Sequence, residues 1–409
     1  MNGTEEKTVT HVHAHWHRLM LILLFGNIVA GIAFSEVMPF LPFFLRDLGD
    51  FSARQLNSYS ALVFSSTYLT ALFLSPLWGK IGDRFGRKPI LLLSALGAAL
   101  TIGAFALVTN VWGLISLRLL QGAFAGYFSN TNALLAAEVP KDKSGYALGT
   151  LATGFITGSL LGPLIGGVTG SLLGYRLTFL ITSFLLMIVF LINLFGVHET
   201  NHRPWIKRSS LKQVRFSALP NKKIIMNLYL TTLLIQIGNN SINPIRSLYV
   251  AHLMNHTGNV TLMSGVVASA PGISCLLMSS YFGRLGDRIG TDRILKISLL
   301  ATVCFVLPMA LVTNIWQLAL LHLLIGLSDA ALLPVVNILL AKNTPVSISS
   351  SIFGYNQSFQ SAGIVIGPFL GSFIANLFGY RGVFLAATLI FCVLVVINKT
   401  ARYQKASKC

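Results

Sequence analysis

The sequence Gly-Lys-Ile-Gly-Asp-Arg-Phe-Gly at residues 79–86 returns as Gly-Arg-Leu-Gly-Asp-Arg-Ile-Gly at residues 283–290. The offset is 204 residues (283 − 79), and the same offset relates Val-Thr-Asn-Val-Trp at 108–112 to Val-Thr-Asn-Ile-Trp at 312–316. Further along, Gly-Tyr-Arg at 174–176 returns at 379–381 with an offset of 205 (379 − 174). Matches that keep their order and spacing predict two similar halves joined head to tail.

Apolar residues dominate the chain. Of its 409 residues, 54% are hydrophobic and 10% are charged, whereas soluble domains carry about 25% charged residues. The sequence therefore predicts an integral membrane protein. Stretches long enough to cross about 30 Å of hydrocarbon occur twelve times, at residues 18–45, 55–79, 89–109, 111–138, 145–172, 175–197, 223–250, 262–283, 293–312, 315–341, 350–377 and 380–398.

The placement of the basic residues predicts the orientation in the membrane. The chain has 30 Lys and Arg against 12 Asp and Glu. If the amino terminus is cytoplasmic, 24 of the 30 fall in cytoplasmic segments and Arg118 falls inside a span. This asymmetry follows the positive-inside rule, so we expect both termini in the cytoplasm. The basic excess is then a matter of topology, with membrane lipids and no nucleic acid as partners. The remaining five are assigned to the outside: Arg46, Arg54, Arg176, Arg246 and Arg381.

The chain is expected to divide into two six-helix bundles with polar segments around them. In order, these are a cytoplasmic tail at 1–17, a bundle at 18–199, a basic cytoplasmic linker at 200–222, a second bundle at 223–398 and a cytoplasmic tail at 399–409. The four cysteines lack the spacing of a metal site. The histidines of the first tail are interpreted as solvated residues in preference to metal ligands, so no metal is predicted.

The loop after the second span carries the first motif. It reads Gly-x-x-x-Asp-Arg-x-Gly-Arg-Lys, and its second copy keeps the Asp-Arg pair. Glycines permit a tight turn, and the basic residues hold the loop at the interface. A loop that merely obeys the positive-inside rule is the alternative, but the fixed spacing and the second copy favour a conformational role. The residues are Gly79, Asp83, Arg84, Gly86, Arg87, Lys88, Asp287 and Arg288. Here the chain resembles the major facilitator superfamily.

The fifth span carries the second motif. Glycines every four residues form a flat helix face that permits close packing, and a proline allows a bend. The pattern comprises Gly154, Gly158, Gly162, Pro163, Gly166 and Gly167, with a partial copy at 363–371. Small residues at this spacing are common in membrane helices. Followed by Gly-Pro-x-x-Gly-Gly in a fifth span, they resemble the motif of the drug:proton antiporter branch of that superfamily.

The resemblance covers nearly the whole chain. Residues 33–42, 132–150 and 355–359 are similar to multidrug efflux proteins of the MdtG and PmrA type. This resemblance implies twelve helices in two pseudo-symmetric bundles, a central cavity, and export of small amphipathic compounds against inward proton flow. Composition and spacing alone predict only a transporter of two bundles.

Ionisable residues inside the spans are candidates for proton coupling, because a charge in the bilayer is unfavourable by several kcal/mol. Glu36, before the bend expected at Pro39 and Pro42, is the best candidate for a proton-binding carboxylate. The alternative is a carboxylate near the outer interface that pairs with Arg46. Arg118 matches an arginine-to-glycine element that the family places near the proton path, and it stays charged when buried.

The second half offers His322 and Asp329. His322 occupies the position that corresponds to Arg118 (118 + 204) and is able to protonate near neutral pH. A histidine bonded to a neighbouring backbone is an equal alternative. Asp329 is the second carboxylate candidate and agrees with the resembled family, whereas His322 departs from the arginine expected there.

Polar and aromatic residues on helices expected to line the cavity are candidates for substrate contact. They are Phe34, Asn130, Asn132, Gln236, Asn240, Asn356 and Gln357. Amides at these depths also bond between helices, which is the interpretation we prefer for about half of them.

The sequence thus predicts an all-α membrane protein of two six-helix bundles that opens alternately to each side. We expect a monomeric proton-driven exporter of drugs or other amphipathic small molecules in a bacterial inner membrane, with the proton as coupling ion and no cofactor. Alternatives are a proton-coupled exporter or importer of one metabolite or siderophore, and a transport-inactive receptor. An enzyme is disfavoured, because no nucleophile with its base and no phosphate-binding loop is found.

Overall fold

The computed structural model describes residues 2–140, 143–199, 222–344 and 349–400. All regular elements within these ranges are helical, as predicted. The linker predicted at 200–222 and the tail at 399–409 lie almost entirely outside the described residues.

The elements fall into two halves. The first half comprises α1 (Asn2–Ser35), α2 (Leu41–Asp47), α3 (Ala53–Phe85), α4 (Arg87–Phe105), α5 (Val111–Ala123), α6 (Tyr127–Glu138), α7 (Ser144–Leu173) and α8 (Tyr175–Gly196). The second half comprises α9 (Lys222–Leu253), α10 (Val260–Ile289), α11 (Thr291–Val306), the 3₁₀ helix η2 (Leu307–Ala310), α12 (Ile315–Lys342) and α13 (Ser349–Thr400).

These elements correspond to the twelve predicted spans with corrections. The first span, predicted over 18–45 with a bend at Pro39 and Pro42, begins earlier and breaks between α1 and α2. Pro39 has no N–H to bond the carbonyl of Ser35, which instead accepts a bond from the Met38 N–H at 3.2 Å. The fourth span is interrupted between α5 and α6, where Phe124 and Ala125 make i→i−3 bonds. The ninth ends in η2.

The repeated motifs mark turns between consecutive spans. Gly86 and Gly290 have φ of 96° and 97°, and Gly174 and Gly379 have φ of 81° and 72°. Residues with a side chain rarely adopt such angles, so glycine allows the chain to reverse in one residue. The turn at Gly379 also divides α13 into the two predicted spans at 350–377 and 380–398. Asn110 and Asn314 are equivalent N-caps, accepting backbone N–H bonds at 2.8 and 2.9 Å.

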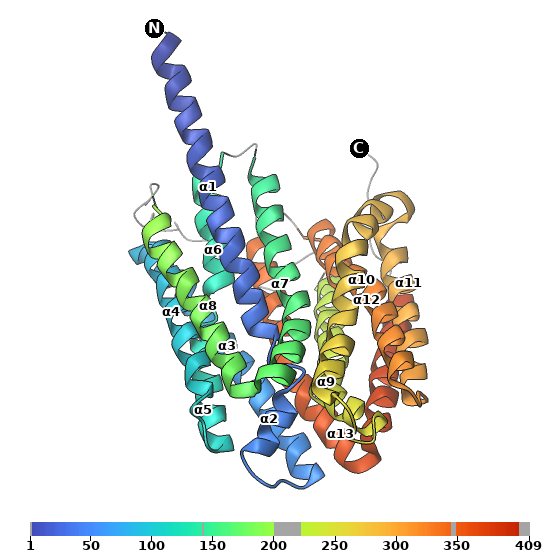
Figure 1. Cartoon of the computed structure of the whole chain (residues 1–409). Coiled ribbons are helices and arrows are strands. Elements are labelled where there is room, and N and C mark those ends of the chain that lie inside the picture. Colours follow the sequence, from blue (N-terminus) through green and yellow to red (C-terminus); the bar gives the residue numbers. More distant parts are fainter. Residues whose placement is uncertain (1, 141–142, 200–221, 345–348, 401–409) are drawn as a thin grey trace.

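Each half has its own hydrophobic core. One buried cluster runs from Trp16 to Val197 and also takes in Leu248 and Ala251 of α9, and a second runs from Ile225 to Leu394. Figure 1 shows α1–α8 beside α9–α13, with the start of α1 and the end of α13 at the same end of the molecule. We call this end the terminal face, and the other end, with the turns at Gly174 and Gly379, the opposite face. Eight described helices are long and apolar enough to cross a membrane.

Glycines bring α7 directly onto α1, as the four-residue spacing predicts. A Cβ added to Gly158 would lie 2.1 Å from the Ile28 carbonyl oxygen, and one on Gly166 would lie 2.1 Å from the Glu36 carbonyl oxygen. The second half repeats this contact, since Gly363, Gly367 and Gly371 of α13 meet the backbone or Cβ atoms of α9. The glycine faces therefore set the distance between the two helices of each pair.

We expect Gly162→Val to abolish transport while the protein still inserts in the membrane. A Cβ at this position would lie 2.0 Å from Ser35 Oγ and 2.8 Å from the Ile32 carbonyl oxygen, so a branched side chain must push α7 away from α1. Overpacking of this kind destabilises by about 1–3 kcal/mol or more. Dye efflux and thermal unfolding of the purified variant measure both effects.

Gly149→Val is the matched control on the same helix, because no atom lies within 4 Å of a Cβ added there. It should retain both activity and stability. Full activity of Gly162→Val would mean that close approach of α7 to α1 is dispensable.

Candidate functional site

Glu36 lies in the break between α1 and α2 and is 1% exposed. Its Oε2 accepts a hydrogen bond of 2.6 Å from the Thr182 hydroxyl of α8. Its Oε1 is buried with no hydrogen-bond partner among the described residues. The carboxyl group is thus half satisfied. A buried carboxylate oxygen without a hydrogen-bond partner is unfavourable. Protonation of the carboxylate would remove its buried negative charge and so lower that cost.

Arg118 of α5 is a buried cation whose charge interacts with this carboxyl group. It is 8% exposed, and its Nη1 donates to Gln121 Oε1 at 3.0 Å. Its guanidinium lies 5.0 Å from the centre of the Phe105 ring. The charges of Glu36 and Arg118 interact without forming a direct ion pair. The alternative pairing of Glu36 with Arg46 does not occur, because Glu36 faces Thr182.

Two small cavities adjoin this cluster. The first, of about 10 Å³, lies against Arg118, and the second, of about 20 Å³, lies against Gln121. Phe34, which the sequence analysis assigned to the substrate cavity, lines both. The first cavity has a volume close to that of a single water-sized probe.

The second half places its carboxylate between α9 and α12. Asp329 Oδ1 accepts a hydrogen bond of 3.0 Å from the Asn239 amide. His322, 3% exposed, lies two helical turns away, and its Nδ1 is 3.0 Å from the Leu318 carbonyl oxygen on its own helix. This is the backbone-bonded arrangement that the sequence left as an alternative.

Arg246, which the count of basic residues assigned to the outside, is buried within the protein. It lies within α9, is 8% exposed, and its charge interacts with His322. The count of basic residues placed it outside because it is close to the end of a predicted span. Its place inside the predicted span at 223–250 was the sequence signal for its burial.

The polar residues predicted for the cavity divide into three groups. Asn130 and Asn132 donate to carbonyl oxygens four residues earlier, and Asn240 donates to Gln236. Asn356 links three helices, because its Oδ1 accepts from Thr232 and its amide donates to Asn337. Gln357 is exposed. Interhelical bonding therefore describes Asn356, whereas the others satisfy their own helix or remain open.

The loop motif is described only in part. The surroundings of Gly79 and the side chains of Asp83, Arg84, Asp287 and Arg288 lie outside the described part of the structure. The backbone N–H groups of Arg87 and Lys88 donate to the Glu199 carboxylate at 3.0–3.1 Å, and Lys88 Nζ donates to the Leu194 carbonyl oxygen at 2.9 Å. Arg87 also bonds the Ala133 carbonyl oxygen. Glu199, which the sequence analysis missed, thus caps the N-terminus of α4 and ties the motif to the end of α8.

The two halves contact each other toward the opposite face. Asn57 of α3 donates to Asn376 of α13 at 2.8 Å, and the Ser65 hydroxyl donates to the Val365 carbonyl oxygen at 2.9 Å. A Cβ added to Gly167 of α7 would lie 2.9 Å from the Cα of Gly265 of α10. These contacts close the molecule at that face.

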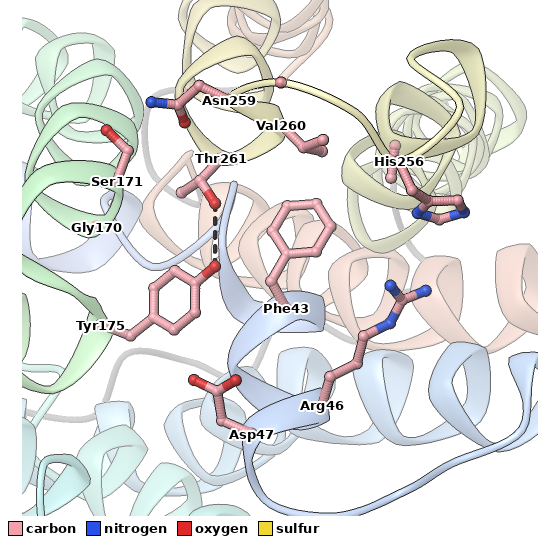
Figure 2. Close-up of a pocket in the computed structure, with 12 residues that line it drawn as sticks. Phe43, Arg46, Asp47, Gly170, Ser171, Tyr175, His256, Asn259, Val260 and Thr261 are labelled. Atoms are coloured by element: carbon pink, nitrogen blue, oxygen red, sulfur yellow. Dashed lines mark hydrogen bonds between the residues drawn. The ribbon is translucent and has the colours of Figure 1, made fainter.

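Figure 2 shows the residues that line a pocket at this closure. The Tyr175 hydroxyl and the Thr261 hydroxyl are 3.0 Å apart and join α8 to α10. Beside them lies a shallow pocket of about 600 Å³ lined by Phe43, Arg46 and His256, among others. Partial burial raises the pKa of the neighbouring Asp47 carboxyl, and the Arg176 guanidinium opposes this rise.

Chemically, the described residues provide an interior carboxyl group and a buried arginine in each half. No group of three or more His, Cys, Asp or Glu side chains able to hold a metal occurs in the described ranges. The carboxyl groups suit reversible proton binding, which requires neither a nucleophile nor a metal.

Comparison with known proteins finds similarity over nearly the whole chain. The model of the family described as the Major Facilitator Superfamily matches residues 23–238 and 228–407. The multidrug resistance protein MdtG of Salmonella arizonae is 42% identical over 401 residues, covering 97% of this chain and 99% of that protein. MdtG of Proteus mirabilis is 42% identical, covering 93% and 95%.

Solved structures share the fold at low identity. A mutant of the nucleoside transporter NupG has a TM-score of 0.79 at 16% identity, covering 93% of this chain and 99% of its own. A bacterial homologue of the human lysosomal transporter Spinster has a TM-score of 0.76 at 13% identity, covering 94% and 96%. These likenesses confirm the predicted fold class of twelve spans in two bundles.

Proposed function

This chain belongs to the Major Facilitator Superfamily, and we propose that it is a proton-coupled exporter of drugs and other amphipathic small molecules. The observation that carries the proposal is its match, at 42% identity over nearly its whole length, to the MdtG multidrug resistance proteins. The proposed location is the cytoplasmic membrane of a bacterium. The terminal face then lies in the cytoplasm, and the closed opposite face lies outside.

The coupling step proposed here is competition between protons and substrate. Glu36 and Asp329 are the proposed proton carriers. Glu36 is buried and accepts a hydrogen bond from Thr182, and Asp329, which is partly buried, accepts one from Asn239. Protonation of Glu36 removes a buried charge, and the nearby Arg118 favours its return to the ionised form. Rocking of the two halves would expose these groups to each side in turn.

Purified protein in proteoliposomes tests this proposal. An imposed proton gradient should drive the neutral dye N-phenyl-1-naphthylamine and the cation ethidium in the direction opposite to proton movement. A proton uncoupler should abolish the uphill component, and ATP should have no effect. Protein-free liposomes are the control. Uphill movement that persists after the gradient collapses, or that needs ATP, would contradict the proposal.

A further inference from the structure

One hydrogen bond between polar side chains joins α9 and α12, and a second pair of polar residues lies at the matching register nearby. These helices run in opposite directions, and Asn239 bonds Asp329 between them at 3.0 Å. Arg246 lies seven residues after Asn239 on α9, and His322 lies seven residues before Asp329 on α12. Seven residues are nearly two turns, or about 10 Å. The second pair therefore lies about 10 Å nearer the opposite face, on the same facing sides, and the interaction of the Arg246 and His322 charges agrees with this register.

Arg246 is a buried cation without a counter-charge. It is 8% exposed, and its Nε has no hydrogen-bond partner in the described structure. The nearest interior acid on these helices, Asp329, is bonded to Asn239 instead. In the first half, by contrast, the Arg118 charge interacts with Glu36. An unpaired charge inside a membrane protein is strongly unfavourable. The second half thus holds a positive charge that its described residues do not neutralise.

His322 adds a second nitrogen to the same place. Because Nδ1 faces the Leu318 carbonyl oxygen at 3.0 Å, Nδ1 carries the proton. Nε2 has no protein partner within the described ranges and lies on the other side of the ring. A guanidinium binds an oxyanion through two parallel N–H groups, and a histidine beside it can donate once Nε2 is protonated. Arg246 therefore supplies the N–H donors of an anion site, and His322 adds a further donor only when Nε2 takes up a proton.

The position of Arg246 suits a transport site. Leu248 and Ala251, which follow it on α9, pack into the hydrophobic core of the first half. This part of α9 therefore lies at the junction of the two halves, where alternating access places its cargo. It also lies on the inner side of the closed opposite face.

We propose that Arg246, with His322, binds the anionic group of an amphipathic substrate, such as a carboxylate or a sulfonate. The inference rests on the proposed export function and narrows its substrate class to include amphipathic anions. A small inorganic anion would bind the same arginine. The test therefore distinguishes a free anion from the anionic group of a substrate.

The experiment compares two dyes with the same aromatic scaffold. 1-Anilinonaphthalene-8-sulfonate carries the anionic group, and N-phenyl-1-naphthylamine lacks it. Arg246→Gln should reduce efflux and binding of the sulfonate by about tenfold or more, and change those of the neutral dye by less than about twofold. Arg246→Lys should retain part of the sulfonate binding, because lysine keeps the positive charge but lacks the two parallel N–H donors of the guanidinium. Arg54→Gln, which removes an exposed arginine, should change neither dye.

Binding is measured separately from transport, by dye fluorescence with the purified full-length protein. If the wild-type protein binds the sulfonate through Arg246 but moves neither dye uphill, the proposed function fails and this inference stands. If it exports both dyes and Arg246→Gln affects them equally or not at all, the function stands and the inference is overturned. If Arg246→Gln abolishes the binding and efflux of both dyes, Arg246 has a structural role and the inference is overturned.

Methanesulfonate and chloride, without dye, complete the test. If either ion raises the thermal midpoint of the wild-type protein but not of Arg246→Gln, while sulfonate dye affinity is unchanged by the substitution, the anion is a free ion. That result would overturn the assignment to substrate.

Discussion

Glu36→Gln is expected to abolish uphill export and to leave downhill exchange of a neutral substrate intact. Glutamine keeps the shape of the side chain, and its amide oxygen is still able to accept the 2.6 Å bond from Thr182. A carboxamide does not bind or release a proton in the transport cycle, so the proton gradient can no longer drive the substrate through this position. Uphill efflux and counterflow of N-phenyl-1-naphthylamine in proteoliposomes measure the two activities in the same preparation.

Asp50→Asn is the matched control, because Asp50 is an exposed carboxylate in the turn before α3. Asp329→Asn, tested in parallel, separates the contributions of the two halves. If Glu36→Gln retains wild-type uphill transport while Asp329→Asn loses it, the coupling carboxylate is in the second half. If both retain it, the coupling site lies outside this pair.

A covalent bridge across the opposite face should stop transport almost completely. Asn57 and Asn376 belong to different halves and are hydrogen-bonded at 2.8 Å, and rocking must separate them when that face opens. We expect Asn57→Cys/Asn376→Cys, in a chain whose four cysteines are replaced by serine, to lose efflux when treated with a short cleavable bis-thiol reagent. A reducing agent that cleaves the bridge should restore efflux. Dye efflux before treatment, after treatment and after reduction is the measurement.

Each single cysteine variant treated with the same reagent is the control, because it cannot form the bridge. Efflux that continues in the bridged protein would mean that α3 and α13 stay together throughout the cycle. The alternating-access scheme would then need its moving contact elsewhere, with α7 and α10 the next pair to bridge.

Much of the fold could be predicted because the sequence repeat between the two halves includes the residues that form turns and cap helices. The glycines at 86 and 290 require positive φ, and Asn110 and Asn314 cap equivalent helices. Such requirements are local, so they can be read from the sequence. A bend in the first span was expected from Pro39 and Pro42, whereas the break in the fourth span was missed. That break depends on i→i−3 bonds made by the backbone of Phe124 and Ala125, and the apolar sequence there gives no sign of them.

The candidate site was harder to predict, because its residues meet across helices. The sequence identified Glu36 as a buried acid but gave no reason to place Thr182 beside it. Arg246 was assigned to the outside by its position near the end of a span, and only the packing of α9 against α12 shows that it is buried. Glu199 follows α8 and caps a helix more than a hundred residues earlier in the chain. Contacts of this kind depend on how helices pack, which the spacing of motifs does not encode.

The contacts that hold the opposite face shut have one property in common. They join amides, hydroxyls, a carbonyl oxygen and glycine backbone, all of which are electrically neutral. Dissolved ions weaken attraction between charges over a Debye length of about 8 Å at physiological ionic strength, but they leave neutral hydrogen bonds and close packing almost unchanged. As far as these contacts determine it, the equilibrium between the inward-open and outward-open states should therefore be the same at low and at high ionic strength.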